Sequence, residues 1–335
     1  MLKIGVLGCG RIGVMHAANI AAHGRAALAG LYDVNGAAAD ALGAKLGAKV
    51  FNTAEAMITS PDVDTVLIAT STATHSDYIE AAIAAGKAVL CEKPIDLDLQ
   101  RVNLCQSRIK DTKLPVMIGF VRRFDAGHRA ARQAMLDGEI GTLHQVVITS
   151  RDPGMAPDAY MQVSGGIFRD MTIHDFDLAR YMLGEEVETV TATGSRLVNP
   201  TLMARLGDYD SVVVTMTTSS GKQAVIINSR QALYGYDQRL ELFGDKGMVI
   251  SENRRAHNMT RHLAGGTNTA APLLDFFIER YADAFNAEIG SFVDAVEGKA
   301  AVEVGFDDGR LALVLAEAAM KSVAEARTVR VSEIG

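Results

Sequence analysis

A glycine-rich turn between a short apolar segment and a helical segment limits the fold of this chain more than any other feature. Residues 8–13 read Gly-Cys-Gly-Arg-Ile-Gly and fit the pattern G-x-G-x-x-G. An apolar strand is expected to end at Leu7, and a helical segment starts at Gly13. In this setting glycine permits a tight turn, close approach of the backbone to a pyrophosphate, and close packing of helix on strand. The turn therefore predicts a dinucleotide-binding βαβ unit.

An acidic residue follows the turn at the spacing that a bound dinucleotide requires. The second predicted strand ends at Asp33, about 20 residues after Gly13. A carboxylate there accepts hydrogen bonds from the ribose hydroxyls and repels a 2′-phosphate, and no arginine follows in residues 34–36. The pattern favours NAD over NADP. The alternative is an ordinary glycine turn with a surface aspartate.

Up to about residue 118 the sequence alternates apolar segments with alanine-rich helical ones. The expected strands are residues 3–7, 27–32, 63–69, 88–91 and 115–118. The expected helices are residues 13–23, 36–46, 75–86 and 99–109. This alternation is typical of right-handed βαβ units around a parallel sheet. We therefore expect an α/β chain that begins with a Rossmann NAD-binding domain over residues 1–118.

The pattern changes in the second part of the chain. Helices are expected at residues 126–136, from about 169, at 273–296 and at 308–326. Strands are expected at residues 187–195, 211–219, 223–229, 239–243, 248–251 and 328–331, with a hairpin turn at 219–222. Strands without intervening helices predict an α+β domain with a large open antiparallel sheet over residues 119–335. The last helix of this domain is a candidate to pack back on the first domain.

Composition excludes several classes of protein. Lysine and arginine number 33 against 40 acidic residues, so we expect no nucleic-acid partner. The three cysteines form no C-x-x-C pair and are odd in number, which predicts neither a zinc site nor a disulfide framework. No apolar segment approaches the ~20 residues of a membrane span, and the short apolar start reads as a strand rather than a signal peptide. We expect a cytoplasmic protein without a metal or a membrane partner.

Polar groups follow two of the predicted parallel strands, at the sheet edge where ligands bind in folds of this kind. Thr70, Ser71 and Thr72, with His75 beyond them, follow the third strand. Glu92 and Lys93 follow the fourth. A lysine ammonium in the cofactor crevice could stabilise the alkoxide that forms as a secondary alcohol loses hydride. The alternative for Lys93 is a lysine that extends from a strand end into solvent.

A second polar group of residues follows a pair of glycines at 165–166. If this segment is helical, Asp170, His174 and Asp177 lie on one face among apolar neighbours. Such a stripe is costly unless it faces a polar cavity, and histidine is suited to take an alcohol proton near neutral pH. A solvated helix face and a set of metal ligands are the alternatives.

The chain resembles the Gfo/Idh/MocA oxidoreductases in five places, from the first strand to the last helices. These are the Gly-Cys-Gly-Arg-Ile-Gly turn, Ala-Thr-Ser-Thr-Ala-Thr-His (69–75), Glu92-Lys93-Pro94, Gly-Phe-Val-Arg-Arg-Phe-Asp (119–125) and the Asp170/His174 pair. Residues 150–153, 164–175, 235–239 and 277–281 are most similar to family members that oxidise inositol.

This resemblance implies NAD-dependent oxidation of a ring hydroxyl of a cyclitol, with myo-inositol oxidised to 2-keto-myo-inositol (scyllo-inosose) as the first case. Scyllo-inositol and aldoses are alternative substrates. The resemblance assigns catalysis to Lys93, Asp170 and His174, with His174 as the general base. It assigns substrate hydroxyls, with less weight, to Arg123, Tyr160, Asp177 and Tyr236. Because the open sheet of the family usually serves subunit association, a homotetramer is expected.

The cofactor contacts are expected at both ends of the dinucleotide. The full set is Gly8, Gly10, Arg11, Ile12, Asp33, Thr70, Ser71, Thr72, His75, Glu92 and Lys93. A non-catalytic NAD-binding regulator would keep the glycine turn and Asp33 but would not need Lys93 or His174. A lyase or epimerase would return the hydride within one turnover, so accumulated NADH distinguishes a dehydrogenase from it.

Overall fold

A computed structural model describes residues 1–334 and divides the chain into two compact units. Unit 1 contains Met1–Phe124 and Asp283–Leu313, and unit 2 contains Asp125–Ala282 and the residues from Val314 onward. A late segment of the chain therefore belongs with the first unit. The domain boundary expected at residues 118/119 stays a prediction.

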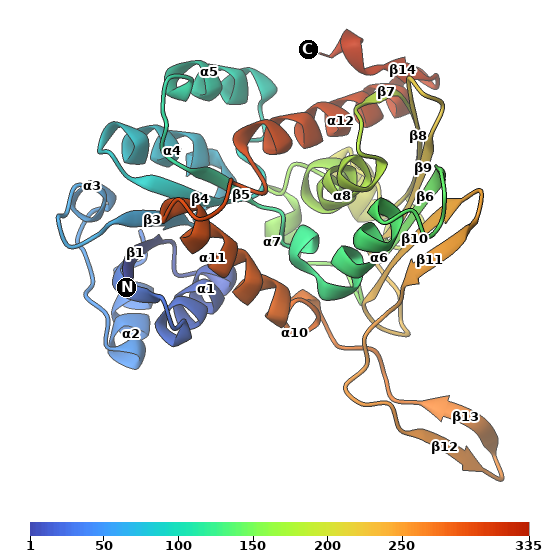
Figure 1. Ribbon diagram of the computed structural model, residues 1–335, viewed down its shortest axis with the longest axis horizontal. Helices are drawn as coiled ribbons and strands as arrows, with labels where there is room; N and C mark the ends of the chain where they lie inside the picture. Colours follow the sequence, from blue (N-terminus) through green and yellow to red (C-terminus); the bar gives the residue numbers. More distant parts are fainter. Residues whose placement is uncertain (335) are drawn as a thin grey trace. The chain divides into compact units, whose positions relative to one another are not determined.

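Unit 1 is built on a five-stranded parallel sheet with the order β2-β1-β3-β4-β5 (Figure 1). Its strands are β1 (Leu2–Leu7), β2 (Ala26–Tyr32), β3 (Thr65–Ile68), β4 (Ala88–Glu92) and β5 (Val116–Gly119). The residues of β3 and β5 are buried throughout, because a parallel sheet is covered by helices on both faces. The five strands expected from the sequence are confirmed.

Five helices of unit 1 connect these parallel strands: α1 (Arg11–Ala22), α2 (Gly36–Leu46), α3 (Ala54–Ile58), α4 (His75–Ala84) and α5 (Leu99–Ile109), with a 3₁₀ turn η1 (Thr72–Thr74). Unit 1 also contains the 3₁₀ turn η2 (Val121–Phe124), most of α11 (Ala282–Val296) and the start of α12 (Phe306–Glu325). Helix α3 was not predicted from the sequence. Its start carries a side-chain cap, because the Thr53 hydroxyl accepts from the Ala56 N–H at 3.1 Å.

Unit 2 is built on a seven-stranded sheet with the order β11-β10-β6-β9-β8-β7-β14. Its strands are β6 (Leu143–Arg151), β7 (Val187–Ser195), β8 (Ser211–Thr218), β9 (Gln223–Ser229), β10 (Asp237–Gly244), β11 (Gly247–Ser251) and β14 (Val329–Arg330). The expected β8–β9 hairpin is confirmed. The sheet is mixed rather than wholly antiparallel, because β6 runs parallel to β9.

Strand β6 is absent from the sequence-based assignment, although it lies in the middle of the sheet. It pairs with β10 on one side and β9 on the other, both far from it in sequence. Its sequence, LHQVVITSR, does not alternate strictly between apolar and polar residues, although glycines precede it and Asp152-Pro153-Gly154 follow it. Long-range pairing of this kind leaves no local periodic pattern to read, so the strand and its parallel register were missed.

The helices of unit 2 include two that lie on one face of its sheet, α6 (Ala126–Leu136) and α8 (Ile173–Leu183) (Figure 1). The others are α7 (Asp158–Met161), α9 (Pro200–Leu206), α10 (Phe277–Arg280) and most of α12 (Phe306–Glu325), and a π-helical turn η3 (Phe168–Thr172) precedes α8. The helix expected from residue 273 begins only at Phe277. Leu273 pairs with Arg255 as an isolated bridge, and Phe276 is extended with φ −150°.

A two-stranded hairpin extends away from the seven-stranded sheet within unit 2 (Figure 1). Its strands are β12 (Thr260–Leu263) and β13 (Gly266–Ala270), and every residue in them is exposed. The sequence analysis did not predict it. None of the helices in residues 1–334 is both long and apolar enough to cross a membrane.

The three cysteines are free thiols in the interior of unit 1. Burial raises the pKa of Cys9 to about 11 and that of Cys105 to about 12. Burial also raises the pKa of Cys91 well above its ordinary value. All three thiols are therefore protonated and unreactive at neutral pH, and they pack as small buried apolar groups.

Candidate active site

The glycine turn between β1 and α1 has the geometry that its sequence predicts. Gly8 has φ +97°, and a Cβ on it would lie 2.3 Å from the carbonyl oxygen of Ala69. A Cβ on Gly13 would lie 1.9 Å from the carbonyl oxygen of Gly8. Gly10, in contrast, has no atom within 4 Å of the position of a Cβ. The first and third glycines thus permit the close packing, and the second borders open space.

The start of α1 and the end of β2 offer groups that suit a dinucleotide. Gly10, the N-cap of α1, provides no side-chain cap, so first-turn N–H groups at Arg11 and Ile12 can bind an anion. Asp33 accepts from the Cys9 N–H at 2.6 Å and from the Asn35 N–H at 2.7 Å. These bonds fix the Asp33 carboxylate at the end of β2, where it would accept from ribose hydroxyls. The residues present therefore fit NAD.

The turn after β3 is ordered by its own hydroxyl groups. The Thr70 and Thr74 hydroxyls lie 2.8 Å apart, and Thr74 donates to the Ser71 carbonyl at 2.8 Å. Thr72 begins the 3₁₀ turn η1. These contacts hold the 70–72 segment beside the carboxyl edge of the sheet, where the sequence analysis expected cofactor contacts.

His75 joins the turns that follow β3 and β4. Its Nδ1 lies 2.8 Å from the Pro94 carbonyl oxygen, and its Nε2 lies 3.1 Å from the Thr70 carbonyl oxygen. The side chain is buried, and this burial lowers the pKa of His75. Its ring is thus engaged with backbone groups of the two turns, which makes it a positioning residue; direct contact with the cofactor stays a prediction.

Lys93 follows directly after β4 in a turn whose backbone is fixed at two points. His75 contacts the Pro94 carbonyl, and the Ser76 hydroxyl donates to the Ile95 carbonyl at 3.2 Å. Lys93 itself is half-buried. The turn therefore presents the lysine from a rigid segment, as a group that acts on a reacting oxygen requires.

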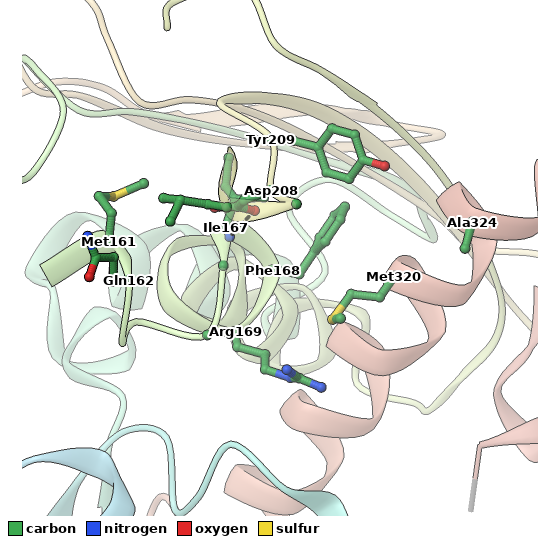
Figure 2. A pocket seen from close by; sticks show the side chains of 13 residues that line it. Met161, Gln162, Ile167, Phe168, Arg169, Asp208, Tyr209, Met320 and Ala324 are labelled. Carbon is green, nitrogen blue, oxygen red and sulfur yellow. Dashed lines mark hydrogen bonds between the residues drawn. The ribbon is translucent and has the colours of Figure 1, made fainter. Parts of the chain in front are cut away.

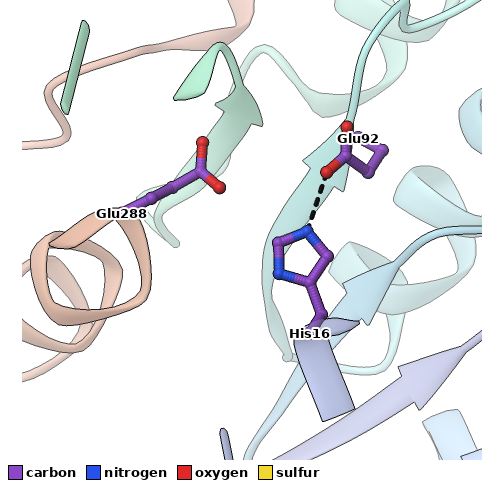
Figure 3. Close-up of side chains that lie close together, drawn as sticks. All are labelled: His16, Glu92 and Glu288. Carbon is purple, nitrogen blue, oxygen red and sulfur yellow. Dashed lines mark hydrogen bonds and ion pairs between the residues drawn. The ribbon is translucent and has the colours of Figure 1, made fainter. Parts of the chain in front are cut away.

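Glu92, the last residue of β4, belongs to a buried cluster (Figure 3). His16 on α1 contacts Glu92, with Nε2 2.7 Å from Oε1, and Glu288 on α11 points toward both. One potential metal-ligand atom from each residue, a carboxylate oxygen or a ring nitrogen, lies within 4.8 Å of the other two. The 2.7 Å contact is a hydrogen bond, shorter than the ~3.3 Å between two ligands of one tetrahedral zinc ion with bonds of about 2.0 Å. We therefore regard the cluster as hydrogen-bonded rather than metal-binding.

In unit 2, Asp170 is held between a tyrosine and an arginine. The Tyr160 hydroxyl donates to Asp170 Oδ1 at 2.7 Å, and Arg230 Nη1 lies 3.1 Å from Asp170 Oδ2. Arg230 also lies 3.7 Å from Asp208, and its side chain is 2% exposed. Partial burial of the hydroxyl and the charge of Asp170 raise the pKa of Tyr160, so Tyr160 remains a donor.

Arg230 did not emerge from the sequence analysis. It follows β9, 60 positions from Asp170, and no local motif relates the two residues. A buried arginine at the end of a central strand is visible only once the strands are paired.

The segment from Phe168 to Leu183 is helical as expected, but Asp170 lies in the π-helical turn η3 and His174 and Asp177 lie in α8; a shared face for the three stays a prediction. His174 is half-buried, and Asp177 is 1% exposed. Asp175, not assigned a role, is fully buried and accepts from Ser150 at 2.7 Å and Asn228 at 2.8 Å. The alternative of a solvated helix face is therefore wrong for this segment.

The remaining predicted substrate residues lie in two different settings. Arg123, in unit 1, is buried; its Nη2 donates to Asp308 at 2.8 Å and its Nη1 to the Glu303 carbonyl at 3.2 Å. Tyr236, in unit 2, is buried in an aromatic cluster with Phe276 and Tyr281, with ring centroids 5.3 and 6.3 Å away. Both side chains make protein contacts, and substrate binding by them stays a prediction.

A cavity of about 400 Å³ lies within unit 2, beside η3 and α12 (Figure 2). Arg169, Asp208, Tyr209 and Met320 are among its lining residues. None of the predicted catalytic or binding residues lines this cavity. Asp208, which shares Arg230 with Asp170, is the link between the cavity wall and the predicted site.

The predicted site residues are divided between the two units. Unit 1 contains Lys93, Arg123 and the cofactor residues, whereas unit 2 contains Tyr160, Asp170, His174, Asp177 and Tyr236. Within unit 2 the structure brings Tyr160 and Asp170 together. Joint action of Lys93 and His174 on one substrate stays a prediction.

Comparisons with known proteins agree with this architecture. A family model described as "Oxidoreductase family, NAD-binding Rossmann fold" matches residues 2–120. A second, described as "GFO/IDH/MocA C-terminal domain", matches residues 128–250. The two matches together span most of the chain, in the order in which the sequence analysis placed a nucleotide domain and a second domain.

Individual relatives match over nearly their whole length. Inositol 2-dehydrogenase of Rhizobium meliloti (strain 1021) is 48% identical over 331 residues, which cover 99% of each chain. The crystal structure of a myo-inositol dehydrogenase from Corynebacterium glutamicum superposes with a TM-score of 0.95, at 42% identity and 98% coverage of both chains. A scyllo-inositol dehydrogenase from Lactobacillus casei, with bound NAD(H) and scyllo-inositol, gives a TM-score of 0.90, at 31% identity and 99% coverage of both chains.

Proposed function

We propose that this chain, which belongs to the Gfo/Idh/MocA oxidoreductase family, oxidises a ring hydroxyl of inositol. It is an NAD-dependent dehydrogenase that acts on a CH–OH group. Our first candidate reaction converts myo-inositol to 2-keto-myo-inositol. The observation that carries this proposal is 48% identity to an inositol 2-dehydrogenase over 99% of both chains. Scyllo-inositol is the second candidate, because the relative with bound scyllo-inositol also matches over the full chain.

We assign the chemistry to three residues. When bound, NAD supplies the hydride acceptor. An imidazole nitrogen of His174 takes the proton of the hydroxyl, acting as the general base. The Lys93 ammonium stabilises the negative charge that develops on the oxygen, and Asp170 orients the donors around it. The fixed turn that carries Lys93 and the contacts of Asp170 with Tyr160 and Arg230 support these roles.

We assign cofactor binding to the carboxyl edge of the parallel sheet. First-turn N–H groups at Arg11 and Ile12 bind the pyrophosphate, and the turn at Gly8 and Gly10 leaves room for it. Asp33 binds the adenosine ribose. The remaining cofactor contacts are assigned to Thr70, Ser71, Thr72, His75, Glu92 and Lys93.

Substrate hydroxyls are assigned to the polar residues around Asp170. Tyr160 is the best supported, because it is 48% exposed and already donates to Asp170. Arg123, Asp177 and Tyr236 are kept as further candidates. Each is buried, so each would contact substrate only at the wall of the site.

Assembly and location are also proposals. We propose a homotetramer, because Val213, Phe243, Met248 and Ile250 are exposed apolar residues on the unit 2 sheet. Three buried free thiols suit a reducing compartment, so we propose the cytoplasm. Light scattering coupled to size-exclusion chromatography measures the oligomeric state, and a monomer would contradict the proposed homotetramer.

The decisive experiment follows NADH formation with a panel of inositol stereoisomers and aldoses, each with NAD and with NADP. We expect turnover with myo-inositol and NAD, and NADH should accumulate. Turnover of the polyol without net NADH would instead indicate a lyase or epimerase. Turnover of none of these alcohols would leave a nucleotide-binding protein such as a regulator.

Substitutions at the assigned residues test the mechanism. Lys93→Ala and His174→Ala should each lower kcat by about 10²–10⁴, the usual effect of losing a positioned acid–base or charged group. Calorimetric titration should show NAD binding to the His174→Ala variant unchanged. Lys110→Ala and His262→Ala, at exposed positions, are the matched controls. A His174→Ala variant with ordinary kcat would exclude the general-base role.

A further inference from the structure

The cluster of His16, Glu92 and Glu288 contains a carboxyl group that the proposed mechanism does not use. Glu288 is completely buried, and neither of its oxygens has a hydrogen-bond partner among residues 1–334. It also has no ion pair within this range. An ionised carboxylate in such a setting is very costly, so the group must be neutralised in some way.

The neighbours of Glu288 indicate how its carboxyl group is neutralised. The titratable groups that face it are Glu92 on β4 and His16 on α1, both within 4.8 Å by their donor atoms (Figure 3). His16 is already hydrogen-bonded to Glu92 at 2.7 Å. Burial, and then the charge of Glu92, raise the pKa of Glu288 well above its ordinary value. The cluster consists of two carboxyl groups and one imidazole and contains no arginine or lysine. We therefore expect it to hold one proton more than it would with both carboxyl groups ionised.

The position of Glu92 connects this cluster to the turn that carries Lys93. Glu92 pairs with Gly119 on β5, and a Cβ on Gly119 would lie 3.2 Å from Glu92 Oε2. A glycine there leaves room for the carboxylate, while His16 holds the other oxygen. Glu92 is thus fixed between α1 and β5, one residue before Lys93. A second negative charge within 4.8 Å would push it from this place.

We propose that Glu288 is a carboxylic acid in the folded protein at neutral pH, and that it is a positioning residue that keeps Glu92, and with it the Lys93 turn, in place. The positioning part rests on the proposed function of Lys93. A protonated Glu288 provides an O–H donor to the Glu92 carboxylate and adds no charge. A divalent cation would be the other way to neutralise the cluster, and the short His16–Glu92 contact disfavours it.

The protonation is tested by comparing thermal stability across pH for Glu288→Gln and the parent protein. When the pKa of a carboxyl group is raised in the folded state, the group stabilises the fold less as pH rises above its pKa in the unfolded chain, which is near 4.5. From about pH 5 to pH 8, the Tm of the parent should therefore fall by about 5 °C relative to Glu288→Gln. A constant difference would overturn the proposal.

Glu80→Gln is the matched control within unit 1. Burial alone would raise the pKa of Glu80, but hydrogen bonds from Arg101 and Arg108 lower it below its ordinary value. Its contribution to stability is present above about pH 4.5 and is lost as pH falls. Glu80→Gln should therefore destabilise the protein near neutral pH, with the difference closing toward acid pH, the opposite sign to Glu288→Gln.

A spectroscopic measurement covers the case in which the Glu288 variant does not fold. Parent protein labelled with ¹³C at glutamate side-chain carbonyls should keep one resonance in the protonated position at pH 7. Absence of such a resonance overturns the proposal. So does stoichiometric binding of Zn²⁺ that is lost in Glu288→Gln, because the cluster would then hold a metal rather than a proton.

The positioning role is tested by kinetics with inositol and NAD. Glu288→Leu removes the donor, whereas Glu288→Gln keeps a neutral donor, so kcat of the leucine variant should be about tenfold below that of the glutamine variant. Equal kcat values would contradict the positioning role. Because the stability and NMR measurements use no substrate, they remain decisive if the protein turns over no polyol.

Discussion

One carboxylate cluster in each unit is neutralised by a different means. In unit 1, Glu92 and Glu288 face one imidazole, and the structure gives Glu288 no cation among residues 1–334. In unit 2, Asp170 and Asp208 share one arginine, Arg230, which is 2% exposed. A proton can leave one centre when pH rises, whereas a guanidinium remains charged throughout. Proton-dependent behaviour is therefore expected at the Glu92/Glu288 cluster and permanent charge at Arg230.

The use of arginine extends through unit 2. Asp125, which caps α6, forms a buried ion pair with Arg280. Asp237, at the start of β10, contacts Arg239 at 2.7 Å and Arg151 at 3.0 Å. Hydrogen bonds from Arg239 and Tyr234 outweigh burial and lower the pKa of Asp237 to about 2. These aspartates hold their charge across the ordinary pH range, unlike Glu288.

Removal of Arg230, the arginine that Asp170 and Asp208 share, should have the largest effect on stability. Arg230→Met leaves two buried carboxylates beside an apolar side chain, and we expect a loss of about 3–5 kcal/mol in the free energy of unfolding. Urea denaturation measures the loss. Arg205→Met, at an exposed ion pair with Asp158, should change stability by less than about 1 kcal/mol and serves as the control. A small effect for Arg230→Met would contradict the view that the buried arginine stabilises these two carboxyl groups.

The pH dependence of stability should show that Asp237, a carboxylate paired with arginine, behaves differently from Glu288. The pKa of Asp237 is about 2 in the folded protein against 3.8 ordinarily, so its contribution is present above about pH 4 and is lost as pH falls through 2. Asp237→Asn should cost about 2 kcal/mol near neutral pH, and the cost should vanish toward pH 2. Chemical denaturation at several pH values measures this. A cost independent of pH would assign the effect to packing instead.

The smallest effect on stability is expected for a carboxylate–arginine pair that is exposed to solvent. Glu333 contacts Arg327 at 2.6 Å and Lys321 at 3.0 Å, and hydrogen bonds from Arg327 lower the pKa of Glu333. Glu333→Gln should leave Tm within about 1 °C of the parent, because solvent screens exposed pairs. A larger shift by calorimetry would show that the end of the chain is a stronger contributor than its exposure indicates.

The features readable from the sequence are those with local causes. The turn at Gly8 and Gly13, the strands of unit 1 and the position of Asp33 follow from apolar periodicity and glycine spacing, and the structure has them where expected. Helix α6 has the predicted bounds, and its N-cap Asp125 accepts from the N–H groups of Gly127 and His128. Each of these depends on neighbours within one or two turns.

The features that were missed depend on distant partners. Strand β6 is assigned only through β9 and β10, and Arg230 gains its role only beside Asp170. Glu288 is different, because its signal was present: it occupies the apolar face of α11, four positions before Phe292 and three after Phe285. A glutamate on such a face indicates a buried acid, although only the fold reveals that Glu92 and His16 face it.

The unreactive thiols have a practical consequence. Cys9, Cys91 and Cys105 are all buried, and burial keeps them protonated at neutral pH. A maleimide dye added to the folded enzyme should therefore find almost no native target. Cysteines introduced at exposed positions, one in each unit, could then carry a donor and an acceptor fluorophore without removal of any natural residue. Energy transfer between them would report, molecule by molecule, the distance between the two labelled positions with and without NAD.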